Sequence, residues 1–287
     1  MEYSRVTTVE EALAALERPG ARLYAGGTDL LIDLHHDSPF AGSVRELVDI
    51  KGIAEARGIR TASGALHVGS LTTAAELEGH ELVARHARAL QDAASRTSAP
   101  MLRARGTVGG NLLARHPAPD MATALLALEA TVRVAVAPQD VRDVPVETVM
   151  ADPGVYGGGD DRARPSIVLG VEIETGARSA FMKLGTRRAF SRARLAGALS
   201  IRGSVHRVVF GGLWDRPRVA RQMSAALDAD GDPVAALGRD LDATDGARER
   251  LRSSGRSARQ LADLVDALLL QAVDRAAPGA VEGGDAR

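Results

Sequence analysis

The sequence contains no cysteine among its 287 residues. This absence excludes a disulfide framework, zinc held by thiolates, an iron-sulfur cluster held by this chain, and catalysis by a thiol. Any redox role of the protein therefore depends on a bound organic cofactor.

The sequence also lacks an excess of charge of one sign. Its 36 Lys and Arg side chains nearly balance its 37 Asp and Glu side chains, and neither sign forms a long block. Nothing in this pattern suggests nucleic acid or an anionic membrane as a partner. The apolar fraction of 45% and charged fraction of 25% are those of an ordinary globular protein.

Long apolar runs are missing as well. No run approaches the length of a membrane span, and the start of the chain carries Glu10 and Glu11 where a secretory signal has a basic patch and an apolar core. We therefore expect a cytoplasmic protein without a membrane-spanning segment.

Two short segments rich in glycine resemble each other. They are "YAGGTDLL" from Tyr24 to Leu31 and "GTVGGNLL" from Gly106 to Leu113. In both, we predict a strand, a Gly-Gly pair, a capping residue (Thr28 or Asn111) and a helix. Adjacent glycines expose backbone N–H groups that can hold phosphate oxygens, especially where a helix begins.

Two interpretations of these segments stay open at this point. A glycine turn leading into a capped helix is common and needs no ligand, whereas two such segments across a groove could surround a diphosphate. The two standard nucleotide patterns are missing, because the chain has no lysine-bearing phosphate loop and no Gly-x-Gly-x-x-Gly after either predicted strand.

The rest of the chain predicts an α+β protein with two small lobes that share a groove. Helices are predicted over Thr8 to Leu16, from Thr28 or Asp29 with "LLIDL" as the apolar face, over Glu81 to Ser95, from Asp120 and from Ala258. Strands are predicted at "ARLYAGG", "ELVDIKGI", "GIRTASG", "ALHVGSL" and "TVRVAVA".

The second half predicts a smaller domain. Four runs with strand character, "SIVLGVEIE", "ARSAFMKLG", "RLAGALSIRG" and "VHRVVFGGLWDRP", favour a smaller antiparallel sheet. We expect a polar connecting loop over Tyr156 to Arg164 and a disordered tail from residue 278. The predicted domains are 1–176, with lobes of about 1–57 and 58–176, and 177–287.

Several longer motifs carry a resemblance to a known family. They include "ARLYAGGTDLL", "LVDIKGI", "HVGSLTTAAEL", "RARGTVGGNLL", "PAPDMATALLALEATV" and "FMKLGTRRA". In these motifs the chain resembles the FAD-binding medium subunit of the molybdenum hydroxylases, of the xanthine dehydrogenase and carbon monoxide dehydrogenase type. The resemblance implies a two-lobed FAD-binding domain of the vanillyl-alcohol-oxidase (PCMH-like) type, and then a small domain with a three-stranded antiparallel sheet and helices.

The resemblance also implies which residues bind FAD. The first segment would place Gly26, Gly27 and Thr28 against the diphosphate, Asp120 would contact the cofactor, and Lys183 would belong to the flavin pocket. The full predicted set is Leu23, Tyr24, Ala25, Gly26, Gly27, Thr28, Asp29, Leu30, Thr107, Val108, Gly109, Gly110, Asn111, Asp120, Leu169 and Lys183. No catalytic residue and no metal site is predicted.

Each polar site residue also has a purely structural interpretation. Asp120 precedes a predicted helix and could serve only as its N-cap. Lys183, with Arg187 and Arg188, could form a solvated strand edge. His35 and His36 are neighbours on a predicted helix and point in different directions, so they make a poor metal pair.

The resemblance implies an electron-transfer subunit. A molybdopterin-binding large subunit would supply electrons to a [2Fe-2S] small subunit. FAD would receive these electrons from the small subunit and pass them to a small-molecule acceptor. Two alternatives stay open: a stand-alone FAD-dependent oxidoreductase acting directly on a small molecule, for example in a biosynthetic pathway, and a non-enzymatic binding module.

Overall fold

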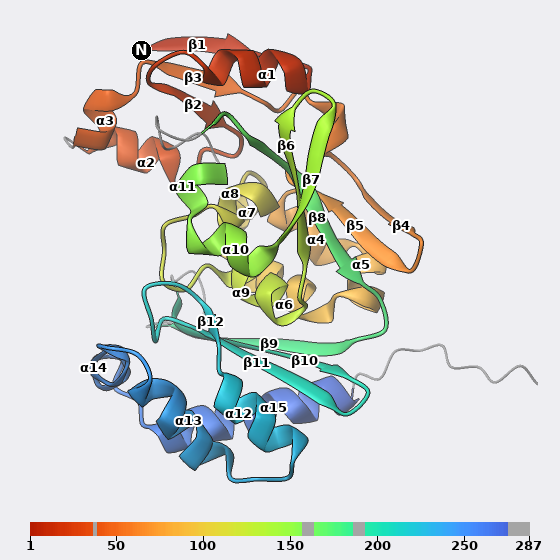
Figure 1. The fold of residues 1–287 in the computed structure, drawn as a ribbon, viewed down its shortest axis with the longest axis vertical. Helices are drawn as coiled ribbons and strands as arrows, with labels where there is room; N and C mark the ends of the chain where they lie inside the picture. Colours follow the sequence, from red (N-terminus) through yellow and green to blue (C-terminus); the bar gives the residue numbers. More distant parts are fainter. Residues whose placement is uncertain (37–38, 157–163, 186–192, 275–287) are drawn as a thin grey trace, which may run out of the picture.

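The computed structural model of the protein describes residues 1–36, 39–156, 164–185 and 193–274. Its strands form three sheets that follow one another along the chain and along the long axis of the molecule (Figure 1). This mixture of helices and sheets agrees with the predicted α+β class. Arg187, Arg188, most of the predicted loop after Tyr156 and the predicted tail lie outside the described residues.

The first sheet has three parallel strands in the order β1-β3-β2. The elements of this unit are β1 (Glu2–Arg5), α1 (Val9–Leu16), β2 (Ala21–Tyr24), α2 (Leu30–His35), α3 (Pro39–Ser43) and β3 (Glu46–Asp49). The predicted first helix is confirmed, and Thr8 and Glu11 form a reciprocal capping box at its start. Strand β2 is an edge strand of this sheet, so the first glycine segment, which follows β2, lies at the edge of the unit.

Helix α2 departs from its prediction. The sequence predicts a helix with an apolar face formed by "LLIDL", but none of its residues is buried, and Leu31 and Ile32 are 45% and 47% exposed. The helix lies beside α3 at the side of the unit, where no sheet of the described chain covers it (Figure 1). The predicted helix is therefore confirmed, and its apolar side chains Leu31 and Ile32 are exposed.

The second sheet is antiparallel, with the order β4-β5-β8-β6-β7. Its strands are β4 (Ile59–Ala62), β5 (Ala65–Gly69), β6 (Thr131–Ala137), β7 (Asp140–Pro145) and β8 (Ile167–Glu174). The accompanying helices are η1 (Ala54–Ala56), α4 (Ala74–Gly79), α5 (Glu81–His86), α6 (Arg88–Arg96), α7 (Pro100–Arg103), α8 (Val108–Leu112), α9 (Asp120–Ala127), α10 (Val146–Ala151) and α11 (Pro153–Tyr156).

Two predictions in this region are corrected. The run Ile167–Glu174 does not belong to the smaller sheet but lies at the centre of the five-stranded one, where Val171 pairs with both Val68 and Val132. The predicted single helix over Glu81 to Ser95 is two helices, because the backbone leaves the helical region at Ala87 with φ −144° and ψ 55°.

Helix α9 is buried along its whole length, because all eight of its residues are buried. It packs against α6 on one side and against strands of the third sheet on the other. This position explains why "MATALLA" carries no polar face: both sides of the helix contact protein.

The third sheet is antiparallel, with the order β12-β11-β10-β9. Its strands are β9 (Arg178–Gly185), β10 (Ala193–Arg202), β11 (Val205–Gly211) and β12 (Arg218–Val219), and its helices are α12 (Arg221–Asp228), α13 (Pro233–Asp242), α14 (Ala247–Ser253) and α15 (Ala258–Asp274). The two-residue β12 makes this a four-stranded sheet, where three strands are expected. The sheet lies between α9 and the C-terminal helices (Figure 1).

Helix α15 approaches the sheet closely at Gly197. A Cβ at this position would lie 3.1 Å from Leu264 and 3.3 Å from Leu268, so the small residue leaves room for both leucines. None of the helices in the described ranges is both long and apolar enough to cross a bilayer.

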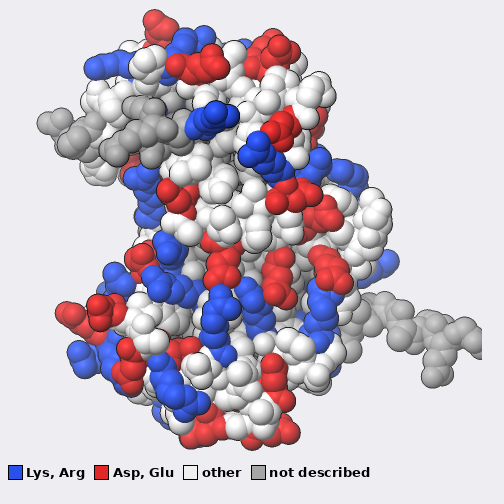
Figure 2. Space-filling model, viewed as in Figure 1, with Lys and Arg blue, Asp and Glu red and all other residues white. Residues whose placement is uncertain are grey.

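We call each sheet together with its helices a unit. Ion pairs join the second and third units. Arg207 of β11 lies 3.2 Å from Glu129 and 3.6 Å from Glu147, and Arg221 lies 3.0 Å from Glu147. Acidic side chains lie above this junction and basic ones below it (Figure 2). Charge complementarity therefore adds to the apolar packing of α9 in fixing how the two units meet.

Candidate cofactor site

The first glycine segment follows β2, and tight packing requires both of its glycines. Gly27 has φ +73°, and a Cβ there would lie 2.5 Å from Cε2 of Tyr24. A Cβ at Gly26 would lie 2.1 Å from the carbonyl oxygen of Arg105. Contacts that short do not occur between real atoms, so a larger residue would displace the Arg105 backbone at position 26, and would displace the Tyr24 ring and strain the backbone at position 27.

This segment presents backbone donors without acceptors. Within the described part of the chain, the N–H groups of Gly26, Gly27 and Thr28 donate to no protein atom. Asp29 is the N-cap residue of α2, which begins at Leu30, but its side chain does not cap the helix. Three consecutive N–H groups are therefore available to an anion.

The second glycine segment is built differently from its prediction. Its glycine pair lies inside α8, and the N-cap is Thr107 rather than Asn111. The Gly110 N–H donates to Thr107 Oγ1 at 3.1 Å, and the Gly109 N–H donates to the Ser70 carbonyl at 2.8 Å. The amides of this pair bond within the protein, so the first segment supplies the open donors.

Asn111 performs another task. Its Oδ1 accepts a hydrogen bond of 3.0 Å from the N–H of Ala122, in the first turn of α9. Val108 donates from its N–H to the Thr72 carbonyl at 2.9 Å. The second segment thus connects the end of β5 with the start of α9.

The fold brings the two glycine segments together, although 79 residues separate Gly26 from Arg105. Arg105 packs its backbone on Gly26, donates from Nε to the Gly26 carbonyl at 3.3 Å, and donates to the Tyr24 hydroxyl at 3.0 Å. A Cβ at Gly106 would lie 3.7 Å from Thr28 Oγ1.

Asp120 and Lys183 form a buried ion pair. Lys183 Nζ lies 2.7 Å from Asp120 Oδ2, and each side chain is 8% exposed. Lys183 also donates to the Arg96 carbonyl at 2.9 Å. Burial raises the pKa of the Asp120 carboxyl, although the Lys183 ammonium opposes that shift.

These contacts correct both structural interpretations from the sequence. The N-cap of α9 is Pro119, so Asp120 is the first residue of the helix and caps nothing. Lys183 lies in the interior rather than on a solvated strand edge. Asp120 Oδ1 is buried and has no hydrogen-bond partner among the described residues.

Leu169 and the second glycine segment both form backbone hydrogen bonds with Ser70. The Leu169 carbonyl accepts a hydrogen bond of 2.9 Å from the Ser70 N–H, and the Leu169 side chain belongs to the core shared with Val48 and Leu71. The hydroxyl groups of Ser70 and Thr72 are buried without a partner in the described chain.

Sequence reasoning missed Lys51 and Arg105. Lys51 Nζ lies 4.0 Å from the centre of the Tyr24 ring and donates to the Ala25 carbonyl at 3.4 Å. Both cations stand in motifs that were already recognised, "LVDIKGI" and "RARGTVGGNLL". Their nearness to the first segment could be found only from the fold.

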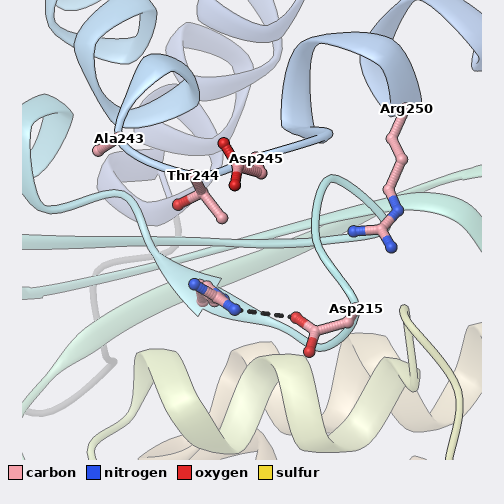
Figure 3. Close-up of a pocket in the computed structure, with 6 residues that line it drawn as sticks. Asp215, Ala243, Thr244, Asp245 and Arg250 are labelled. Atoms are coloured by element: carbon pink, nitrogen blue, oxygen red, sulfur yellow. Dashed lines mark hydrogen bonds and ion pairs between the residues drawn. The ribbon is translucent and has the colours of Figure 1, made fainter.

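A separate open cavity of about 470 Å³ lies in the third unit (Figure 3). It is lined by Asp215, Arg218, Ala243, Thr244, Asp245 and Arg250. None of the predicted site residues lines it, and its polar wall includes the Arg218–Asp215 ion pair of 2.9 Å. The open amides of Gly26, Gly27 and Thr28 and the unpartnered polar atoms of Ser70, Thr72 and Asp120 all lie outside this cavity.

Comparison with known proteins identifies the class. Residues 1–173 match the family described as the FAD binding domain in molybdopterin dehydrogenase, and the chain belongs to this family. The resemblance inferred from its motifs is therefore confirmed.

Among curated proteins, the chain is 39% identical over 154 residues to the xanthine dehydrogenase FAD-binding subunit of Escherichia coli O157:H7, covering 53% of this chain and 51% of that protein. It is 36% identical over 137 residues to the nicotinate dehydrogenase FAD-subunit of Eubacterium barkeri, covering 46% and 44%. The chain thus matches about half the length of these relatives.

Solved structures extend the likeness in fold over nearly the whole chain. A chain of carbon monoxide dehydrogenase from Hydrogenophaga pseudoflava superposes with a TM-score of 0.77, covering 96% of this chain and 98% of that one. The sequence identity is 24%, so this likeness concerns the fold alone.

Proposed function

We propose that this protein is the FAD-binding electron-transfer subunit of a molybdenum-containing hydroxylase or dehydrogenase complex. The observation that carries the proposal is the set of open N–H groups at Gly26, Gly27 and Thr28, packed against the second glycine segment in a chain of the FAD-binding family. The domain division at about residue 176 remains part of the proposal.

The residues present fit FAD. Its diphosphate is an acceptor for the open amides of the first segment, and the glycines at 26 and 27 let that segment pack closely against Arg105 and Tyr24. The unpartnered Asp120 Oδ1 and the hydroxyls of Ser70 and Thr72 offer further polar contacts. Of the predicted residues, Leu23 to Leu30 and Thr107 to Asn111 would hold the dinucleotide, with Leu169 nearby.

The chain's own contribution is to position and insulate the cofactor. Bound FAD supplies the ability to exchange electrons one or two at a time. The Asp120–Lys183 pair would place a fixed polar contact at the flavin pocket, because burial and three hydrogen bonds hold Lys183 and Asp120 in place. No nucleophile or metal ligand is needed for this role.

Partners follow from the family and from the composition. A chain without cysteine holds no iron-sulfur cluster, so a [2Fe-2S] small subunit and a molybdopterin-binding large subunit are the proposed partners. The relatives above are named as subunits, which favours a subunit over the stand-alone oxidoreductase. Membership of an FAD-binding family likewise disfavours a binding module for another nucleotide.

Co-purification from the native host tests the proposal. We expect a complex that contains FAD, iron and molybdenum, with flavin absorbance in this chain. A yellow chain that purifies alone and oxidises a small molecule would support the stand-alone alternative instead. A colourless chain that binds no FAD would contradict both.

A further inference from the structure

Lys51 and Arg105 hold two consecutive carbonyl groups of the first glycine segment. Lys51 Nζ donates to the Ala25 carbonyl at 3.4 Å, and Arg105 Nε donates to the Gly26 carbonyl at 3.3 Å. The two side chains come from different units of the fold, one after β3 and the other after α7.

These contacts fix the direction of the next N–H groups. The described chain has no cis peptide bond, and in a trans peptide the C=O and N–H groups point in opposite directions. Holding the Ala25 carbonyl therefore turns the Gly26 N–H away from Lys51. Holding the Gly26 carbonyl turns the Gly27 N–H away from Arg105 in the same manner.

Both cations are themselves held in place. Lys51 lies 2.8 Å from the buried carboxylate of Asp49 and over the Tyr24 ring, and Asp49 also accepts a hydrogen bond from Tyr3. Arg105 donates to the Tyr24 hydroxyl at 3.0 Å. Tyr24 thus contacts both cations, and its ring also packs against Gly27.

We propose that Lys51 and Arg105 are positioning residues, which orient the N–H groups of Gly26 and Gly27 toward the diphosphate of the cofactor by binding the carbonyls behind them. This inference rests on the proposed FAD site and adds two residues to it. The side chains act on the backbone, and the backbone contacts the phosphates.

The first test measures FAD affinity in the full chain. Lys51→Met and Arg105→Met each remove one carbonyl contact and keep an aliphatic stem, so we expect the Kd for FAD to rise about three- to tenfold. Arg259→Met is the control, because this side chain is 77% exposed on α15, far along the chain from the site. Unchanged affinity in both test variants would overturn the proposal.

The second test separates positioning from charge. Arg105→Gln removes the charge but keeps a donor for the Gly26 carbonyl, so positioning predicts affinity within about twofold of the natural protein. It also predicts an unchanged salt dependence. If Arg105→Gln and Arg105→Met lose the same FAD affinity, and FAD binding depends less on salt in both, the Arg105 charge attracts phosphate directly. That result would overturn positioning. Arg105 is exposed, so this arm decides the question even if Lys51→Met folds poorly.

The third test does not depend on FAD. The amide resonances of Gly26 and Gly27 are followed while inorganic pyrophosphate is added to the natural chain and to both Met variants. We expect shifts in the natural chain that are lost in the variants. Failure of the natural chain to bind FAD would contradict the proposed function, whereas amides that ignore pyrophosphate, or shift equally in the variants, would contradict this inference.

Discussion

Lys183 Nζ lies 2.7 Å from Asp120 Oδ2 inside the protein, and 63 residues separate the two in the sequence. The pair joins β9 of the third unit to the first residue of α9. One carboxylate oxygen is satisfied by this contact, and the other has no partner in the described chain.

Loss of the ammonium group should destabilise the protein at neutral pH. Lys183→Met leaves a buried carboxylate without its counter-charge, and we expect the free energy of unfolding to fall by about 3–5 kcal/mol. Urea unfolding at pH 8 measures this. The double variant Asp120→Asn with Lys183→Met should recover part of the loss, because it leaves no buried charge.

The same pair predicts a pH dependence. Burial raises the pKa of Asp120 in the folded state, so folding favours its protonated form, and stability falls as pH rises from the ordinary Asp value through the raised one. In Lys183→Met the pKa of Asp120 rises further. The loss of stability of this variant relative to the natural protein should therefore shrink as the pH is lowered through the pKa that Asp120 has in the variant. A deficit that stays constant at every pH at which both proteins fold would contradict a buried ionised carboxylate.

Gly27→Ala should abolish tight FAD binding. The new Cβ meets the Tyr24 ring at 2.5 Å and sits at φ +73°. Gly58→Ala is a matched control, since Gly58 has φ +91° but nothing within 4 Å of a Cβ. Both variants should lose about 1 kcal/mol of stability from backbone strain. Gly27→Ala should lose more because its Cβ also contacts Tyr24, and only Gly27→Ala should lose flavin absorbance. Full flavin occupancy in Gly27→Ala would remove the first segment from the site.

The adjacent glycines of α8 should respond differently to substitution. A Cβ at Gly109 meets Ser70 Cβ at 2.9 Å, whereas a Cβ at Gly110 meets only Thr107 Oγ1, at 3.0 Å. Gly109→Ala should therefore lower the melting temperature more than Gly110→Ala. Gly110→Val should fold and bind FAD weakly, and an unaffected flavin spectrum would argue that this glycine does not face the cofactor.

Asn111→Ala should destabilise the start of α9. The substitution leaves the Ala122 N–H without its acceptor, at an expected cost of about 1 kcal/mol. Asn111→Asp keeps an acceptor oxygen and should retain most of the stability. Thermal unfolding of the two variants compares them directly, and equal melting temperatures would mean that this hydrogen bond contributes little.

Local sequence signals predicted many elements correctly. Thr8 and Glu11 mark the start of α1, and the apolar run of β6 is a strand as expected. Errors arose where distant contacts decided the outcome. Val171 joined the larger sheet because strands on both sides pair with it, and Asp120 became an ion-pair partner because Lys183 reaches it from another unit.

The two glycine pairs show the same limit. Their sequences are alike, but their structures differ. The N–H groups of Gly26 and Gly27 have no acceptor in the described chain. Gly109 and Gly110 lie in a helix, and their N–H groups donate to Ser70 and Thr107. Sequence alone could mark both as places of close backbone approach. It could not say which one keeps its donors open.

By itself, the sequence determined that the chain can hold no cysteine-ligated cluster, that it mixes helices and strands, and that its motifs are those of an FAD-binding family. These conclusions depend on residue types and on order along the chain. Only the tertiary structure decided that Arg105 contacts Gly26, that Lys51 lies over Tyr24, and that Asp120 pairs with Lys183. Such contacts depend on how three sheets pack together, and packing is set by the whole chain at once.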